Sequence, residues 1–151
     1  MKLHLRLAIA AALAVVAPAA LTAPAAAQEF PLAPGEYSSM SGIFVEDGGS
    51  FAYAQFLATQ WQQEQEFSKS KGWITGYKIY INVDARDGEP NVYLVTTYRD
   101  IPDAAEIERR NKEYAAWSAK TDQQLDAESG NRVTIRKQRG TMLLQEYTIR
   151  K

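Results

Sequence analysis

Residues 73–98, WITGYKIYINVDARDGEPNVYLVTTY, contain two apolar runs separated by a segment rich in turn-forming residues. In the first run, large apolar side chains fall at every second position, which is the spacing of one face of a β-strand; they are Tyr77, Ile79, Ile81 and Val83. The second run, 92–98, is rich in β-branched and aromatic residues. The segment between them, DARDGEPN, favours a turn. The pattern predicts an antiparallel hairpin.

A helix is predicted on each side of this hairpin. Between Ser50, the expected N-cap, and Gly72, the expected stop, one helical face carries Tyr53, Phe56, Leu57, Gln60, Trp61, Glu64 and Phe67. A second helix with a narrower apolar stripe is expected from about Asp103 to Glu128, before Gly130.

Strands are predicted at both ends of the domain. Residues 36–46 favour one strand, and the prolines and glycine of residues 28–35 indicate an extended leader before it. Residues 132–151 contain two β-rich runs separated by Arg139 and Gly140, which fits either one bulged strand or a terminal hairpin. The order over residues 36–151 is that of an α+β, ferredoxin-like βαββαβ sandwich, with an antiparallel sheet and two helices on one face.

Both faces of this sheet are expected to be apolar. In the third strand Val92 and Leu94 share one face while Tyr93 and Val95 share the other. A sheet with one wet face should alternate apolar with polar residues. We therefore expect a homodimer in which two copies pack through the faces that carry no helices.

The chain resembles the dimeric α/β barrel superfamily, whose members pair two ferredoxin-like sheets face to face. The resemblance lies in the element order and in residues 93–103, YLVTTYRDIPD, a strand that leads through an acidic turn into a helix. It implies a range of activities, from cofactor-independent oxygenases, haem-degrading enzymes and small-molecule lyases to domains without a known reaction. Haem-handling members usually supply a His to the iron, and the one His of this chain is His4. We therefore expect no haem and no other cofactor.

The first 27 residues have the layout of a secretory signal. A positive start with Lys2 and Arg6 is followed by an apolar run and by the small residues 25–27, which suit a signal peptidase. The alternative is an uncleaved membrane anchor, but Pro18 and Pro24 interrupt the stretch. The sequence thus predicts a signal peptide over 1–27, a periplasmic or secreted domain, and no stable membrane insertion after cleavage.

The composition excludes several classes of chemistry. The 151 residues include no Cys, and cleavage after residue 27 would remove the only His, so disulfides, metal-thiolate sites and a Ser-His-Asp triad are ruled out for the mature chain. Loss of Lys2 and Arg6 would leave 15 basic against 18 acidic residues, a net charge of −3. A weakly acidic domain lacks the positive field that nucleic-acid binding needs, so we expect no nucleic-acid partner.

Positive charge is nonetheless concentrated near the C-terminus. Residues 132–151 contain six basic residues against Glu146 alone. This segment fits either the solvated face of an edge strand or a docking site for an acidic ligand or anionic lipid.

Aromatic and polar side chains between the helices and the sheet are the candidate ligand-binding residues. They are Tyr53, Trp61, Glu64, Tyr77, Asn82, Tyr98, Arg99 and Trp117. The alternatives are a close-packed core and an apolar pocket with a few orienting polar groups. Glu64 stands out because an unpaired carboxylate on an apolar face is costly. It should pair, for instance with Lys78 or Arg99, reach the edge, or lie in a pocket with a raised pKa.

Three functions fit these features. The first is binding of a small apolar or aromatic molecule by an exported dimeric domain without a metal. The second is a cofactor-independent oxygenase or related small-molecule enzyme that uses Trp, Tyr, Asn and Arg groups. The third is a structural or interaction module of the cell envelope that docks through its basic C-terminal strand.

Overall fold

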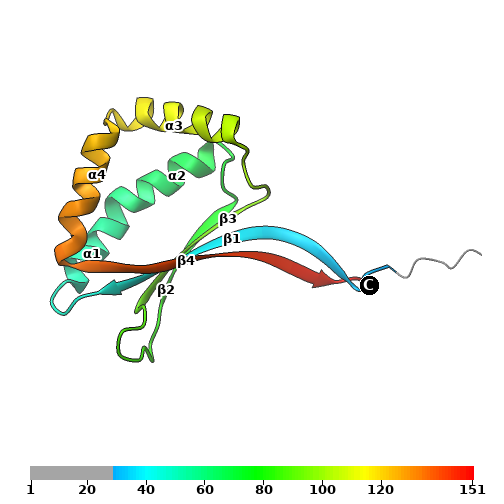
Figure 1. Cartoon of the computed structure of the whole chain (residues 1–151), viewed down its shortest axis with the longest axis horizontal. Coiled ribbons are helices and arrows are strands. Elements are labelled where there is room, and N and C mark those ends of the chain that lie inside the picture. Colours follow the sequence, from blue (N-terminus) through cyan, green and yellow to red (C-terminus); the bar gives the residue numbers. More distant parts are fainter. Residues whose placement is uncertain (1–28) are drawn as a thin grey trace, which may run out of the picture.

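The computed structural model describes residues 29–151, so the signal peptide predicted at 1–27 lies outside the described residues. Figure 1 shows a sheet on one side and the helices on the other. The elements are β1 (Leu32–Val45), α1 (Ser50–Phe56), the π-helical segment η1 (Leu57–Trp61), α2 (Gln62–Ser70), β2 (Gly76–Ile81), β3 (Val92–Tyr98), α3 (Ala104–Ser118), α4 (Asp122–Asn131), the 3₁₀ turn η2 (Arg132–Thr134) and β4 (Arg136–Ile149).

The four strands form one sheet in the order β2-β3-β1-β4, and every neighbouring pair is antiparallel. The predicted hairpin is β2 and β3, with Ile79 opposite Leu94. The α+β class and the four-stranded antiparallel sheet are confirmed, and they are compatible with a ferredoxin-like fold.

The two long strands, β1 and β4, differ in detail from the prediction. β1 begins at Leu32, within the stretch expected to be a leader, and Leu32 pairs with Ile149 at the far end of β4. This end of the two strands runs out beyond the helices (Figure 1). The C-terminal segment is one bulged strand, the first of the two alternatives. Its register against β1 shifts next to Gly140, whose φ of 134° favours glycine.

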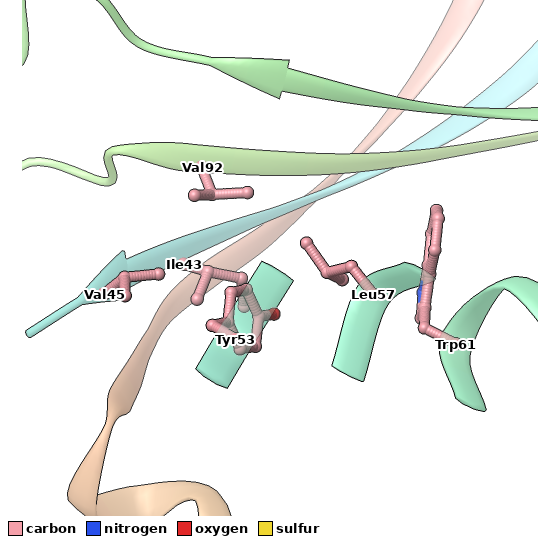
Figure 2. Close-up of a cluster of buried hydrophobic side chains, with 6 residues drawn as sticks. All are labelled: Ile43, Val45, Tyr53, Leu57, Trp61 and Val92. Carbon is pink, nitrogen blue, oxygen red and sulfur yellow. The ribbon is translucent and has the colours of Figure 1, made fainter. Parts of the chain in front are cut away.

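The core lies between the first helix and the sheet. α1, η1 and α2 form one continuous helix from Ser50 to Ser70. Figure 2 shows its sheet-facing side chains meeting those of β1 and β3. The buried cluster comprises Ile43, Val45, Tyr53, Leu57, Trp61 and Val92. The three helical members are spaced four residues apart, about one helical turn, so they lie on one side of the helix.

Two local features of this helix were not expected from its sequence. Gly49, rather than Ser50, is the N-cap residue, and no side chain caps this end. The π-helical turn includes Thr59, whose hydroxyl donates a hydrogen bond of 2.7 Å to the Gln55 carbonyl. In a regular α-helix that carbonyl accepts from the amide of residue 59, so the hydroxyl competes with the helical bond.

The prediction of a single second helix is wrong, because the chain breaks at Ala119. Ala119 adopts a left-handed conformation with φ 53°, which ends α3. Thr121 then starts α4 with a capping box, in which Thr121 and Gln124 exchange side-chain and backbone hydrogen bonds.

The second helical region also packs differently from the expected sandwich. α3 lies against α2, where the rings of Phe67 and Trp117 stack with their centroids 4.4 Å apart. On the sheet itself, Leu143 of β4 shares the helix-side face with Leu94 through their pairing with Ser39 and Ser41, and it remains 55% exposed. The first helix therefore covers the sheet, and α3 forms a further layer on that helix.

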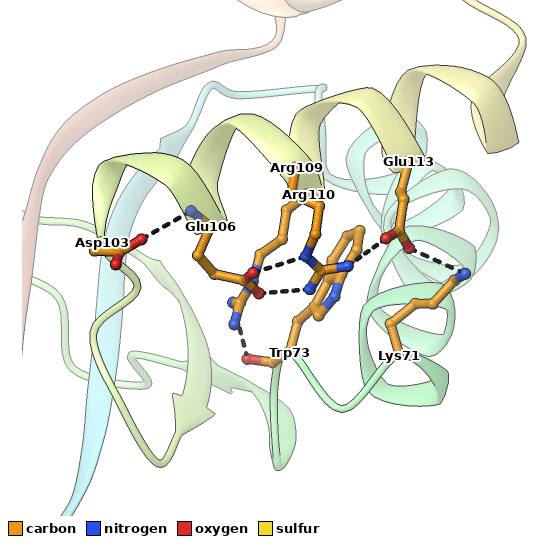
Figure 3. Close-up of polar contacts among 7 residues, drawn as sticks. All are labelled: Lys71, Trp73, Asp103, Glu106, Arg109, Arg110 and Glu113. Atoms are coloured by element: carbon orange, nitrogen blue, oxygen red, sulfur yellow. Dashed lines mark hydrogen bonds and ion pairs between the residues drawn. The ribbon is translucent and has the colours of Figure 1, made fainter.

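A polar network fastens α3 to the end of α2 (Figure 3). Asp103 caps α3 by accepting from the Glu106 amide at 2.8 Å. The Glu106 carboxylate accepts from Arg109 at 2.7 Å and from Arg110 at 2.5 Å, and these hydrogen bonds lower its pKa to about 2. Glu113 meets Lys71 at 3.1 Å. Because all these groups are part-exposed, the network orients α3 more than it stabilises the fold.

None of the helices found within residues 29–151 combines the length and the apolar character needed to cross a bilayer.

Candidate functional site

An apolar groove runs between the first helix and the edge strand β2. Two adjoining hollows of about 350 and 400 Å³ form it, and both are lined by Ala54, Leu57 and Ile81. Tyr53 and Val92 line the first hollow, whereas Trp61 and Tyr77 line the second. We call this feature the helix–β2 groove.

The groove exists because small side chains face an uncovered strand. Ala54 and Ala58 are one helical turn apart, and their methyl groups leave space beside β2. Since β2 is an edge strand, no further element within residues 29–151 covers it, and Ile79 and Ile81 remain 43% and 62% exposed. Apolar side chains are thus held at an open surface, where a ligand could remove them from water.

Aromatic side chains form the inner wall. Trp61 meets the Tyr77 ring edge-on, with centroids 5.3 Å apart, which fixes both rings. Tyr53 is 2% exposed, and its burial raises the pKa of its hydroxyl. These three residues are sequence-predicted candidates that the structure brings to one groove.

The polar groups beside the groove already have partners. Asn91 is held by Val45, accepting from its amide at 2.8 Å and donating to its carbonyl at 2.9 Å. The Tyr77 hydroxyl donates to Glu66 at 2.5 Å, and this hydrogen bond raises the pKa of Tyr77. The groove therefore offers apolar contact and no free charge from these groups.

Glu64 and Trp117 lie at a different site, between α2 and α3. They line a hollow of about 280 Å³ together with Tyr114 and Lys120. Glu64 accepts a hydrogen bond from the Gln60 side chain at 3.1 Å, so its expected pairing with Lys78 or Arg99 is not found. Lys78 lies on the opposite face of the sheet, where its strand partner is Val95. Burial, and then the Glu64 charge, raise the pKa of Tyr114 well above its usual range.

The remaining three candidates lie outside the helix–β2 groove and outside the hollow that contains Glu64 and Trp117. Asn82 holds the β2–β3 turn: its side chain donates to the Pro90 carbonyl at 3.2 Å and accepts from the Asp84 amide at 3.2 Å. Tyr98 stacks on Tyr37 with centroids 6.2 Å apart. Arg99 is exposed in the loop that follows β3. The structure does not bring these side chains to the groove.

Several groove residues were missed at the sequence level. Ala54, Ala58 and Ile81 were not selected, although two small residues one turn apart on a sheet-facing helix are a readable signal. Their position beside an edge strand is not readable, because strand order depends on tertiary pairing.

Within residues 29–151 no cluster of three or more Asp, Glu, His or Cys side chains is placed to hold a metal ion. Comparison of the chain with protein-family models, with curated proteins and with solved structures gives no match.

Proposed function

We propose that this protein binds a small apolar or aromatic molecule in the helix–β2 groove. The observation that carries the proposal is the pair of adjoining hollows, about 350 and 400 Å³, which share an apolar wall. Small-molecule sites commonly have volumes of roughly 300–1,000 Å³ and mostly hydrophobic and aromatic linings. The partners that Asn91 and Tyr77 already have favour an uncharged ligand.

The π-helical turn supports the same site. η1 spans Leu57 to Trp61, and both of these end residues line the groove. Single π turns inside α-helices occur frequently at functional sites, because they shift side chains away from the regular helical positions.

A blocking substitution tests this proposal. Ala54 lines both hollows and is exposed, so Ala54→Trp should fill the groove without removing a core side chain. The matched control is Ala116→Trp, which adds the same side chain at an exposed position of α3. The probe is N-phenyl-1-naphthylamine, an uncharged aromatic amine whose fluorescence rises in apolar surroundings.

We expect saturable binding by the wild type and by Ala116→Trp. Binding by Ala54→Trp should be at least about tenfold weaker, which corresponds to about 1.4 kcal/mol. Equal affinity of the two variants, or no saturable binding by the wild type, would refute the groove as a binding site.

We also propose that a second copy of the chain covers the sheet face that carries no helices. This face has a hollow of about 530 Å³ lined by Met40, Tyr80, Val95 and Leu144, with Tyr80 and Leu144 nearly half exposed. Lys78 and Glu146 line the same hollow. A two-fold axis that passes between these two groups would bring each copy's positive group toward the other's negative one, which is compatible with self-association of this face. The signal predicted at 1–27 would place this dimer in the periplasm or outside the cell.

A further inference from the structure

A positively charged hollow lies where the C-terminal end of α4 meets the start of β4. Its volume is about 500 Å³, and Arg136, Lys137 and Arg139 line it, opposed by the single carboxylate of Asp126. The Ser129 hydroxyl also faces it. We call it the α4–β4 hollow; it shares no lining residue with the helix–β2 groove.

Two arginines in this hollow have donors to spare, Arg139, which only lies over the Phe44 ring, and Arg136. The Arg136 side chain forms no ion pair with any residue in 29–151, and its one hydrogen bond, to the Ser129 hydroxyl, is long at 3.4 Å. Its Nε atom is buried and has no hydrogen-bond partner. A guanidinium carries five donors, and burying one of them unpaired is costly.

The neighbouring arginine increases this cost. Arg132 also forms no ion pair within the described part of the chain, its Nε is buried without a partner, and its guanidinium lies 4.1 Å from the centre of the Phe56 ring. Burial, and then the charge of Arg136, lower the pKa of Arg132. Glu64 and Glu128 act in the opposite direction on Arg132. Their carboxylates already accept from the Gln60 amide, and Glu128 is also paired with Lys120 at 2.6 Å.

The other cations of the hollow are partly engaged. Lys137 pairs with Glu46 at 2.6 Å, and the Arg139 guanidinium lies over the Phe44 ring at 5.1 Å. The residues that line the hollow include three cations and one carboxylate, a net charge of +2, and the Glu46 carboxylate that pairs with Lys137 lowers this to +1. An anion with one or two negative charges would balance this excess: the phosphodiester of a lipid headgroup carries one, and a phosphate monoester at neutral pH carries close to two.

We propose that the α4–β4 hollow binds a phosphate group, with Arg136 as its principal donor. A phosphate oxygen can accept from the guanidinium of Arg136 and from the Ser129 hydroxyl, since both side chains line the hollow. The phosphate can belong to a free phosphorylated compound or to a lipid headgroup, because the recognised chemistry is the same.

Calorimetric titration with inorganic phosphate tests the site. Arg136→Gln removes the charge, Arg136→Lys keeps the charge but loses the fork of donors, and Arg86→Gln is the matched control on the exposed β2–β3 turn. We expect the wild type to bind one phosphate per chain in a saturable way. The phosphate affinity of Arg136→Gln should be at least about tenfold lower, that of Arg136→Lys should be intermediate, and that of Arg86→Gln should equal the wild-type affinity. Thermal unfolding of each variant checks that it is folded, and Arg139→Gln replaces Arg136→Gln if the latter is not.

Vesicle flotation distinguishes the two sources. Vesicles of phosphatidylglycerol test the headgroup, and vesicles of phosphatidylcholine are the uncharged control. Arg136-dependent binding to phosphatidylglycerol supports the site with lipid as its source, and phosphate binding without vesicle binding supports it with a free compound. Binding that Arg136→Gln leaves unchanged, or no binding in either assay, overturns the proposal. Ala54→Trp should bind phosphate normally, so failure of the groove and failure of this site are separable.

Discussion

Trp61 connects the core of the protein to the helix–β2 groove. Its side chain is buried in the cluster between helix and sheet, and its ring also meets Tyr77 at the groove wall. Removing a large buried ring costs the transfer energy of the ring and leaves a cavity that the neighbours fill only in part.

We therefore predict that Trp61→Ala lowers the free energy of unfolding by about 3–5 kcal/mol, measured by urea denaturation. The control is Phe51→Ala on the same helix, where the ring is 76% exposed and the loss should stay below about 0.5 kcal/mol. Similar losses in the two variants would mean that Trp61 is not part of a packed core.

Glu106 supplies a pH-dependent prediction at the residue scale. Its hydrogen bonds with Arg109 and Arg110 lower its folded pKa from an ordinary value of 4.5 to about 2. A carboxyl with a lowered folded pKa stabilises the native state above the unfolded pKa, and this contribution is lost as the pH falls from 4.5 to about 2.

We expect the side-chain carboxyl resonance of Glu106 to titrate with a midpoint near 2. The double variant Arg109→Gln, Arg110→Gln should move the midpoint up toward 4.5. A wild-type midpoint already near 4.5 would show that the two guanidiniums do not hold the carboxylate.

At the scale of elements, the start of α4 after the break at Ala119 is fixed by a capping box. Thr121 accepts from the Gln124 amide at 3.3 Å, and the Gln124 side chain accepts from the Thr121 amide at 2.9 Å. Thr121→Ala should lower the free energy for local opening of α4 by about 1 kcal/mol, measured by amide hydrogen exchange, whereas Thr121→Ser should retain most of it. Equal exchange in all three proteins would contradict the capping role.

The elements also show which parts of the fold the spacing of apolar residues predicts and which it does not. The β2–β3 hairpin is predictable because apolar side chains recur at every second position in residues 73–98. The first helix is predictable because they recur about every 3.6 positions in residues 50–71. The single second helix was wrong because an apolar stripe can continue across a break, although the Thr121–Gln124 pair is a capping-box signal visible in the sequence. The packing of α3 on α2 depends on tertiary contacts that no local pattern contains.

The candidate site is predictable only in part for the same reason, because residue spacing does not contain tertiary contacts. Tyr53, Trp61 and Tyr77 were found because their spacing places them on faces that meet. Asn82 and Arg99 lie near strand ends, and residue spacing does not show whether a strand end lies at a groove or in a turn. Glu64 is unusual on an apolar face, but the neighbours that surround it, Tyr114 and Trp117, come from α3, whose placement no local pattern contains.

At the scale of the whole molecule, β4 offers a matched pair of positions for the proposed dimer. Leu144 lines the hollow on the face without helices, whereas Leu143 points to the other face and is similarly exposed. Leu144→Asp should place a charge in the interface and weaken dimerisation at least about tenfold, and Leu143→Asp should leave it unchanged. Sedimentation equilibrium measures both. A wild-type protein that stays monomeric at high concentration would contradict the proposal that the protein dimerises.

The location of the bound molecule tests the proposed function. In methyl-labelled protein titrated with N-phenyl-1-naphthylamine, the NMR resonances to follow are those of Leu57, Ile79 and Ile81 in the groove and of Val95 and Leu144 on the opposite sheet face. We predict saturable shifts of the groove methyl groups, with those of Val95 and Leu144 unchanged. Shifts confined to Val95 and Leu144, or no saturable shift of the groove methyl groups, would contradict a ligand site between the first helix and β2.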